Sequence, residues 1–129
     1  MRLRTTRPVT FDVDDPNGQA GEFRFMKPRT PDGYEVVREE KGVKNYSIEY
    51  TNNDGGIILY FQSGNVETMS ASFDNENAEF NEIVVNGYKG YSYSKLGNNA
   101  LYWTDGISMF DIGGNCNMDT LWQMAKSIK

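Results

Sequence analysis

Alternating apolar and polar positions run through the middle of the chain. Residues 44–52 carry apolar side chains at every second position, Tyr46, Ile48 and Tyr50, which is typical of a strand with one buried face. Residues 57–62, Ile-Ile-Leu-Tyr-Phe-Gln, are apolar on both faces instead. Strands covered on both sides have this character. The pattern therefore predicts a central strand at 57–62, with something packed on each side of it.

Shorter runs with strand character surround this segment, and turn-forming residues separate them. These runs lie at 21–28, 34–40, 66–73, 82–85, 91–94, 101–103 and 107–112. The turns between them include 52–56, Asn86-Gly87 and 97–99. Because the connections are short, neighbouring strands are expected to pair antiparallel. The sequence therefore predicts a curved antiparallel meander sheet of seven to eight strands.

One helix is predicted at the C-terminus. Asn117 is a suitable cap, and apolar residues recur at the helical positions Leu121, Met124, Ala125 and Ile128. A helix of about eleven residues is marginal alone, so it must pack on the sheet, where 57–62 is the natural site. The expected fold is α+β. Its predicted core consists of Ile57, Leu59, Phe61, Trp103, Leu121 and Met124.

The chain of 129 residues is long enough for one domain with its own core. We expect a single α+β domain at 23–129, preceded by a partly ordered N-terminal extension at 1–22. Cys116 is the only cysteine, so an intrachain disulfide is excluded. Neither a membrane-spanning run nor a signal peptide is visible. Met1 is either the native start or the start of a fragment.

The charge balance argues against anionic partners. Thirteen basic and eighteen acidic residues give a net charge of −5. Nucleic acid requires a concentrated positive face, and an anionic membrane surface also attracts basic segments. We therefore expect no nucleic-acid partner and no direct membrane binding.

The chain lacks the usual catalytic and metal-binding signatures. It contains no histidine, which removes Ser-His-Asp catalysis, Cys-His catalysis and histidine zinc sites. The acidic stretch 12–18 does not fit the calcium-loop pattern, and Asp74, Glu76 and Glu79 have the character of solvated loop charge. Cys116 is interpreted as a small residue at a strand–helix junction. We expect no cofactor, no metal and no enzymatic activity.

Tyrosines are the most suggestive residues. Tyr88, Tyr91, Tyr93 and Tyr102 lie on predicted strands or turns, and together on one face they would form a ligand- or partner-binding surface. The alternative is that they form cross-strand pairs in the core and its rim. Trp103 is expected to close the core rather than to contact a ligand.

Several segments together resemble a known family. They are residues 31–37, 48–62, 84–94, 101–114 and 118–129, and in order and spacing they are similar to the domain of unknown function 4367 family. The resemblance implies no catalytic residues and a shared core that includes Trp103 and the 87–93 hairpin. It also implies an extracytoplasmic position at the C-terminal end of Gram-positive, membrane-anchored proteins, some with an anti-sigma-factor-like region. Membrane attachment would require a segment absent from this chain.

Three functional hypotheses follow. The leading one is a non-enzymatic binding or sensing module at the cell surface that recognises a protein or cell-envelope component, with a cytoplasmic location as the alternative. The second is a carrier of a small apolar ligand, held in a cavity lined by Ile57, Leu59, Phe61, Leu121 and Met124. The third is a hydrolase with two carboxylates, one of them in an apolar setting that raises its pKa. The oligomeric state stays open.

Overall fold

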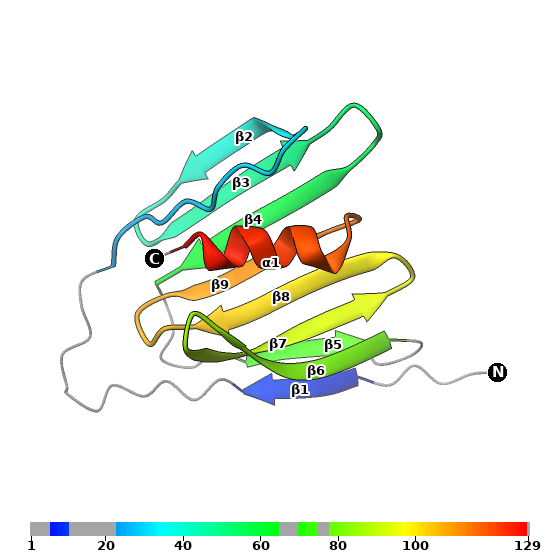
Figure 1. Ribbon diagram of the computed structural model, residues 1–129. Coiled ribbons are helices and arrows are strands. Elements are labelled where there is room, and N and C mark those ends of the chain that lie inside the picture. Colours follow the sequence, from blue (N-terminus) through cyan, green and yellow to red (C-terminus); the bar gives the residue numbers. More distant parts are fainter. Residues whose placement is uncertain (1–5, 11–22, 65–69, 75–77, 129) are drawn as a thin grey trace.

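The computed structural model describes residues 6–10, 23–64, 70–74 and 78–128. Within these ranges the chain forms nine strands and one helix (Figure 1). They are β1 (Thr6–Thr10), β2 (Glu35–Lys41), β3 (Asn45–Thr51), β4 (Ile57–Ser63), β5 (Ser70–Asp74), β6 (Ala78–Val85), β7 (Tyr88–Lys95), β8 (Asn98–Thr104), β9 (Met109–Gly114) and α1 (Met118–Lys126). Seven strands make one antiparallel sheet in the order β2-β3-β4-β9-β8-β7-β6. The predicted α+β class, with one C-terminal helix on an antiparallel sheet, is confirmed.

The sheet consists of two meanders joined in the middle. Strands β2, β3 and β4 follow one another along the chain, and so do β6, β7, β8 and β9. The two runs meet where β4 pairs with β9, from Ile58 opposite Gly114 to Ser63 opposite Met109. Apart from this sheet, β1 near the N-terminus pairs with β5 as a separate two-stranded ribbon. The central position predicted for residues 57–62 is therefore confirmed, whereas the predicted cover on both of its faces is wrong, because alternate side chains of β4 are exposed.

Hairpin turns form where the local sequence favours positive φ. Asn86 and Gly87 have φ of 52° and 87°, as in the type I′ turn that suits the twist of paired strands. The next turn uses Leu96 and Gly97, with φ of 50° and 82°. It begins one residue before the predicted 97–99 segment, so that leucine occupies a conformation that glycine or asparagine usually adopts.

The helix α1 begins at its predicted cap. The Asn117 side chain accepts a hydrogen bond from the Thr120 backbone N–H at 2.9 Å, which satisfies one of the unpaired donors of the first turn. Leu121, Met124 and Ala125 are buried. The helix packs mainly on β8 and also on β9, whereas the sequence favoured residues 57–62 as its docking site.

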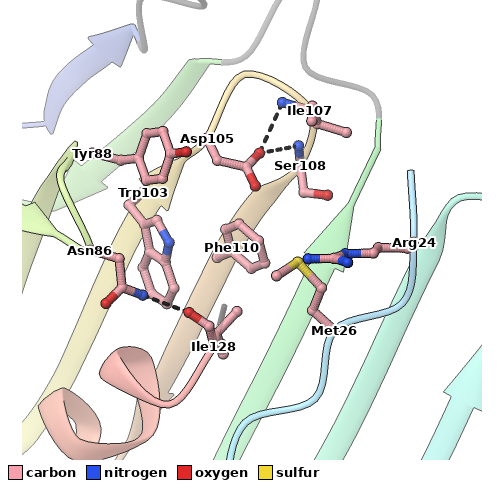
Figure 2. Close-up of a pocket in the computed structure, with 10 residues that line it drawn as sticks. All are labelled: Arg24, Met26, Asn86, Tyr88, Trp103, Asp105, Ile107, Ser108, Phe110 and Ile128. Atoms are coloured by element: carbon pink, nitrogen blue, oxygen red, sulfur yellow. Dashed lines mark hydrogen bonds between the residues drawn. The ribbon is translucent and has the colours of Figure 1, made fainter. Parts of the chain in front are cut away.

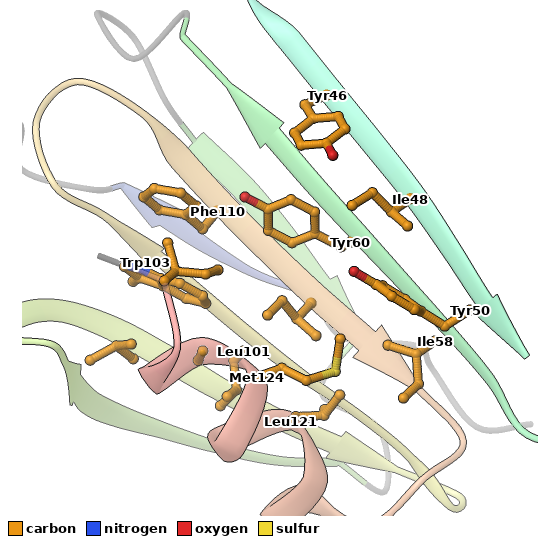
Figure 3. Close-up of a cluster of buried hydrophobic side chains, with 14 residues drawn as sticks. Tyr46, Ile48, Tyr50, Ile58, Tyr60, Leu101, Trp103, Phe110, Leu121 and Met124 are labelled. Carbon is orange, nitrogen blue, oxygen red and sulfur yellow. The ribbon is translucent and has the colours of Figure 1, made fainter. Parts of the chain in front are cut away.

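The core lies between α1 and the sheet face beneath it (Figure 3). Trp103 is 1% exposed, and its ring stacks on Phe110 with centroids 4.9 Å apart. Opposite Trp103 in the ladder stands Gly90, where a Cβ atom would lie 2.3 Å from the Tyr102 carbonyl oxygen and 2.7 Å from the Trp103 Cβ. Trp103 therefore closes the core, as predicted.

Three residues of the predicted core lie elsewhere. Ile57, Leu59 and Phe61 are 46%, 56% and 43% exposed, so placing them in the core was wrong. The reason is the alternation of side chains along a strand: their neighbours Ile58 and Tyr60 occupy the α1 side. The predicted cavity is wrong for the same reason, because Ile57, Leu59 and Phe61 lie on the face opposite the buried Leu121 and Met124.

Residues 23–30 form an extended segment beside α1 instead of the predicted strand; residues 21 and 22 lie outside the described ranges. The buried Gln62 holds this segment. Its Oε1 accepts from the Met26 N–H at 2.9 Å, and its Nε2 donates to the Arg24 carbonyl and to Ser108 Oγ, both at 2.9 Å. The Tyr60 hydroxyl donates to the Met26 carbonyl at 2.6 Å. We call residues 23–30 the strap; with α1, it covers one face of the sheet.

Candidate functional site

The sheet face away from α1, which we call the open face, is covered unevenly. Tyr91 and Ala100, on β7 and β8, are buried there. On β4, in contrast, Ile57, Leu59 and Phe61 expose about half of their surface to solvent. In Figures 1 and 3, both seen from the α1 side, the β1–β5 ribbon passes behind strands of the large sheet. The uncovered apolar surface is therefore centred on β4.

A groove of about 400 Å³ lies on the open face across β2, β3, β4, β9 and β8. Two small residues, Ala100 and Gly113, stand opposite each other in the β8–β9 ladder, and a Cβ atom on Gly113 would lie 3.3 Å from the Ala100 Cβ. They leave a hollow between larger neighbours. The apolar walls come from Leu59, Phe61 and Tyr102.

Asp111 is the notable polar group of this groove. On β9 it stands in register between Phe61 of β4 and Tyr102 of β8. Its carboxylate makes neither a hydrogen bond nor an ion pair with any residue in the described ranges. Burial raises the pKa of this carboxyl from its ordinary 3.8 to about 7, because desolvation disfavours the charged form. The groove thus holds an acid without a partner among the described residues, and the raised pKa places its change of charge near neutral pH.

The remaining charged groups line the groove on the β2 and β3 side. They are Arg38, Glu40 and Glu49. With Asp111, the groove carries three acidic side chains and one basic side chain. Ionised, it has an excess of negative charge, and it is therefore suited to a cationic group rather than to an anion.

The four tyrosines proposed as a binding face do not all lie on the same face of the sheet. Tyr91, Tyr93 and Tyr102 share the open face, because they are related by strand alternation and cross-strand register. Tyr91 is buried and its ring stacks on Phe80 with centroids 5.1 Å apart, as the cross-strand alternative predicted. Tyr102 lines the groove, and Tyr88 lies on the α1 side at a second hollow. Their role in binding stays a prediction.

This second hollow is a half-open pocket of about 720 Å³ at the C-terminal end of α1 (Figure 2). The buried Trp103 and Phe110 lie at its base, Met26 comes from the strap, and Ile128 follows the helix. The Asn86 side chain donates to the Ala125 and Ile128 carbonyls at 3.0 and 2.7 Å, which ties the β6–β7 turn to the helix end. The pocket is therefore framed by fixed backbone.

The Thr-Asp-Gly turn of the sequence has a structural role at the rim of this pocket. Asp105 Oδ1 accepts hydrogen bonds from the backbone N–H groups of Ile107 and Ser108 at 2.9 and 2.8 Å (Figure 2). Thr104 Oγ1 donates to the Ser108 carbonyl at 2.8 Å. These side-chain bonds add to the backbone bond from the Asp105 N–H to the Ser108 carbonyl at 3.2 Å, and they fix the path of the chain from β8 to β9.

The other chemical candidates lead to no reactive centre. Burial raises the pKa of the Cys116 thiol, which lowers its thiolate fraction and so its nucleophilicity. No group of three or more acidic or cysteine side chains that could hold a metal ion occurs in the described part of the chain. The acidic stretch 12–18 and Glu76 lie outside that part. Asp111 has the apolar setting that the carboxylate-hydrolase hypothesis requires, and that hypothesis stays a prediction.

Fold and groove together define a small α+β domain with one covered and one partly uncovered sheet face. The model of the domain of unknown function 4367 family matches residues 28–128, and the chain belongs to that family. The matched range runs from the strap to the end of the helix region and includes all seven strands of the large sheet. No curated protein and no solved structure gives a match. Among the described residues, no helix is long and apolar enough to cross a membrane.

Proposed function

We propose that this domain is a non-enzymatic binding module that recognises another protein through the open face around β4. The observation that carries the proposal is the exposure of Ile57, Leu59 and Phe61 on a strand in the interior of the sheet. Both edges of β4 are already paired with β3 and β9, so these side chains do not serve strand addition. Contiguous exposed apolar side chains with a polar rim are typical of protein interaction sites.

The proposed setting is the extracytoplasmic surface of a Gram-positive cell, where the module senses or binds a protein of the envelope. This part rests on the resemblance to a family found at the C-terminal end of membrane-anchored proteins. Protease treatment of intact cells of the source organism tests it. An extracytoplasmic domain is cleaved in intact cells, whereas a cytoplasmic domain is cleaved only after lysis.

A comparison of two matched double variants tests the binding proposal. Leu59→Ser with Phe61→Ser removes apolar surface from the groove wall, and Val37→Ser with Val43→Ser removes it from β2 and the following turn, where both valines are also exposed. Each purified protein is immobilised and incubated with the detergent-solubilised envelope of the source organism. A protein retained by wild type and by the valine variant, but lost with the groove variant, supports the proposal. Equal retention by both variants contradicts it.

The pocket at the end of α1 favours a second candidate function, carriage of a small apolar ligand. Its volume of about 720 Å³ lies within the range that small-molecule sites occupy, and its lining includes Tyr88, whose ring is partly exposed. Native mass spectrometry of protein purified without denaturation tests this candidate. A copurifying extra mass supports carriage, and a bare chain leaves protein recognition as the function to pursue.

A further inference from the structure

Building on the proposed protein-binding function, we infer that the partner presents a basic side chain flanked by apolar residues, and that this side chain enters the open-face groove and pairs with Asp111. The inference adds the chemistry of the partner to the location of the site. It depends on the arrangement of the groove on β4, β9 and β8, on its excess of acidic groups, and on the Asp111 carboxylate, which has no hydrogen-bond or ion-pair partner in the described part of the chain.

The floor of the groove provides the space. Gly113 and Ala100 lie beside Asp111 and carry little or no side chain, so the hollow reaches down to the sheet next to the carboxylate. Leu59 and Phe61 stand along one side of that hollow. A lysine or arginine suits this shape, because its methylene stem packs on apolar surface while its charged end reaches a polar group.

The charged side chains of the groove indicate the charge of the group that it binds. Glu40, Glu49 and Asp111 outnumber Arg38 in the groove, and the whole chain has a net charge of −5. A carboxylate left unpaired in an apolar site is unfavourable, and a hydrogen-bonded cation removes that penalty. An anionic partner, including an anionic lipid surface, would meet repulsion here. The groove therefore selects a cationic group.

If a cation pairs with Asp111, its binding must depend on pH. The titratable and charged groups that face Asp111 across the groove are Tyr102 on β8, Arg38 and Glu40 on β2, and Glu49 on β3. The free carboxyl has a pKa of about 7, and a bound cation lowers it because it favours the charged form. Binding of a cation is therefore expected to strengthen as the pH rises from 5.5 to 8 and to weaken again on acidification.

Two peptides that differ by one ammonium group test the inference. The probes are acetylated, amidated Ser-Leu-Lys-Phe-Ser and the same peptide with norleucine in place of lysine. Binding is followed by NMR chemical-shift changes of the groove amides at pH 8 and pH 5.5. Wild type is compared with Asp111→Asn and with Asp32→Asn, which removes the same charge from an exposed turn. We expect the lysine peptide to bind about tenfold or more tightly than the norleucine peptide at pH 8, as a hydrogen bond between charged groups contributes.

The preference for lysine should disappear in Asp111→Asn and persist in Asp32→Asn. Equal binding of both peptides in wild type, lost in Leu59→Ser with Phe61→Ser, overturns the cationic inference and leaves the proposed apolar docking function standing. Failure of both peptides to shift the groove amides overturns the inference. As a second measurement on wild type alone, the lysine peptide must lower the pKa of the Asp111 carboxyl in a carbon-13 titration; an unchanged pKa contradicts the pairing.

Discussion

The two faces of β4 have nearly the same apolar character and opposite surroundings. On one face, Ile58 and Tyr60 are buried beneath α1 and the strap. On the other, Ile57, Leu59 and Phe61 are about half exposed. An apolar residue is usually explained by the core it fills, but here only one of the two faces has a core to fill. The comparison indicates that the first face stabilises the fold and the second serves a contact outside it.

A core substitution on the covered face should cause the largest loss of stability. Trp103→Ala is expected to lower the free energy of unfolding by about 3–5 kcal/mol, as large-to-small aromatic substitutions in cores do. Phe61→Ala on the open face should cost less, about 1 kcal/mol, because nearly half of its surface stays in contact with solvent in the folded protein. Urea denaturation of both variants checks the difference. Equal losses would show that the two faces do not differ in their contribution to stability.

Replacing Gln62, on the same covered face, should lower the free energy of unfolding by a smaller amount. Gln62→Leu removes the hydrogen bonds to the Met26 N–H, the Arg24 carbonyl and Ser108 Oγ, and we expect a loss of about 2 kcal/mol because part-buried groups of the strap and the buried Ser108 hydroxyl lose this partner. Hydrogen exchange at the Met26 amide should accelerate. Gln123→Leu, at an exposed helix position, is the control with the same side-chain change. An unaltered exchange rate would mean that Gln62 does not hold the strap.

On the open face, Asp111 should make the free energy of unfolding depend on pH. The folded state raises the pKa of Asp111 from 3.8 to about 7, so it binds this proton more tightly than the unfolded chain does. The free energy of unfolding therefore falls as the pH rises from about 4 to about 7, and this penalty is fully present above pH 7. Asp111→Asn should stabilise the protein at pH 8 by about 1–2 kcal/mol, after discounting for partial contact with solvent. Denaturation at pH 4.5 and pH 8 measures this; a variant less stable than wild type at pH 8 would contradict it.

Replacing an apolar wall of the groove should have the smallest effect on the free energy of unfolding. Leu59→Ser should change the free energy of unfolding by less than about 0.5 kcal/mol, in the range of ordinary surface substitutions. The same variant should lose partner binding in the envelope retention experiment. Thermal denaturation beside that experiment checks both parts. A large loss of stability would indicate that Leu59 belongs to a packed region after all.

Much of the fold could be predicted because its signals are local. The Asn86-Gly87 turn and the Asn117 cap depend on residues a few positions apart. The pairing of β4 with β9 and the bonds from Gln62 to the strap join residues more than 30 positions apart, and no local pattern specifies them. Alternation predicted two apolar faces for residues 57–62, but nothing in the strand itself states whether both are covered.

The candidate site was harder to predict than the fold. The sequence pointed to Tyr102, which does line the groove, but it missed Asp111. The available signal was an acidic residue inside the apolar run Met109-Phe110-Asp111-Ile112, since charged residues are rarely placed in strand interiors without a reason. Arg38 and Glu49 come from strands far from β9 along the chain, and only the sheet order brings them to the same groove.

Site-specific photocrosslinking in cells of the source organism tests the central claim most directly. A photoreactive phenylalanine analogue is placed at Leu59 in the groove and, in a second protein, at Val43 in the β2–β3 turn, which is the more exposed of the two positions. We predict a discrete protein adduct from position 59, lost when Phe61→Ser is added, and no matching adduct from position 43. The same adducts from both positions, or none from position 59, would contradict the claim that the open face of β4 is the binding surface.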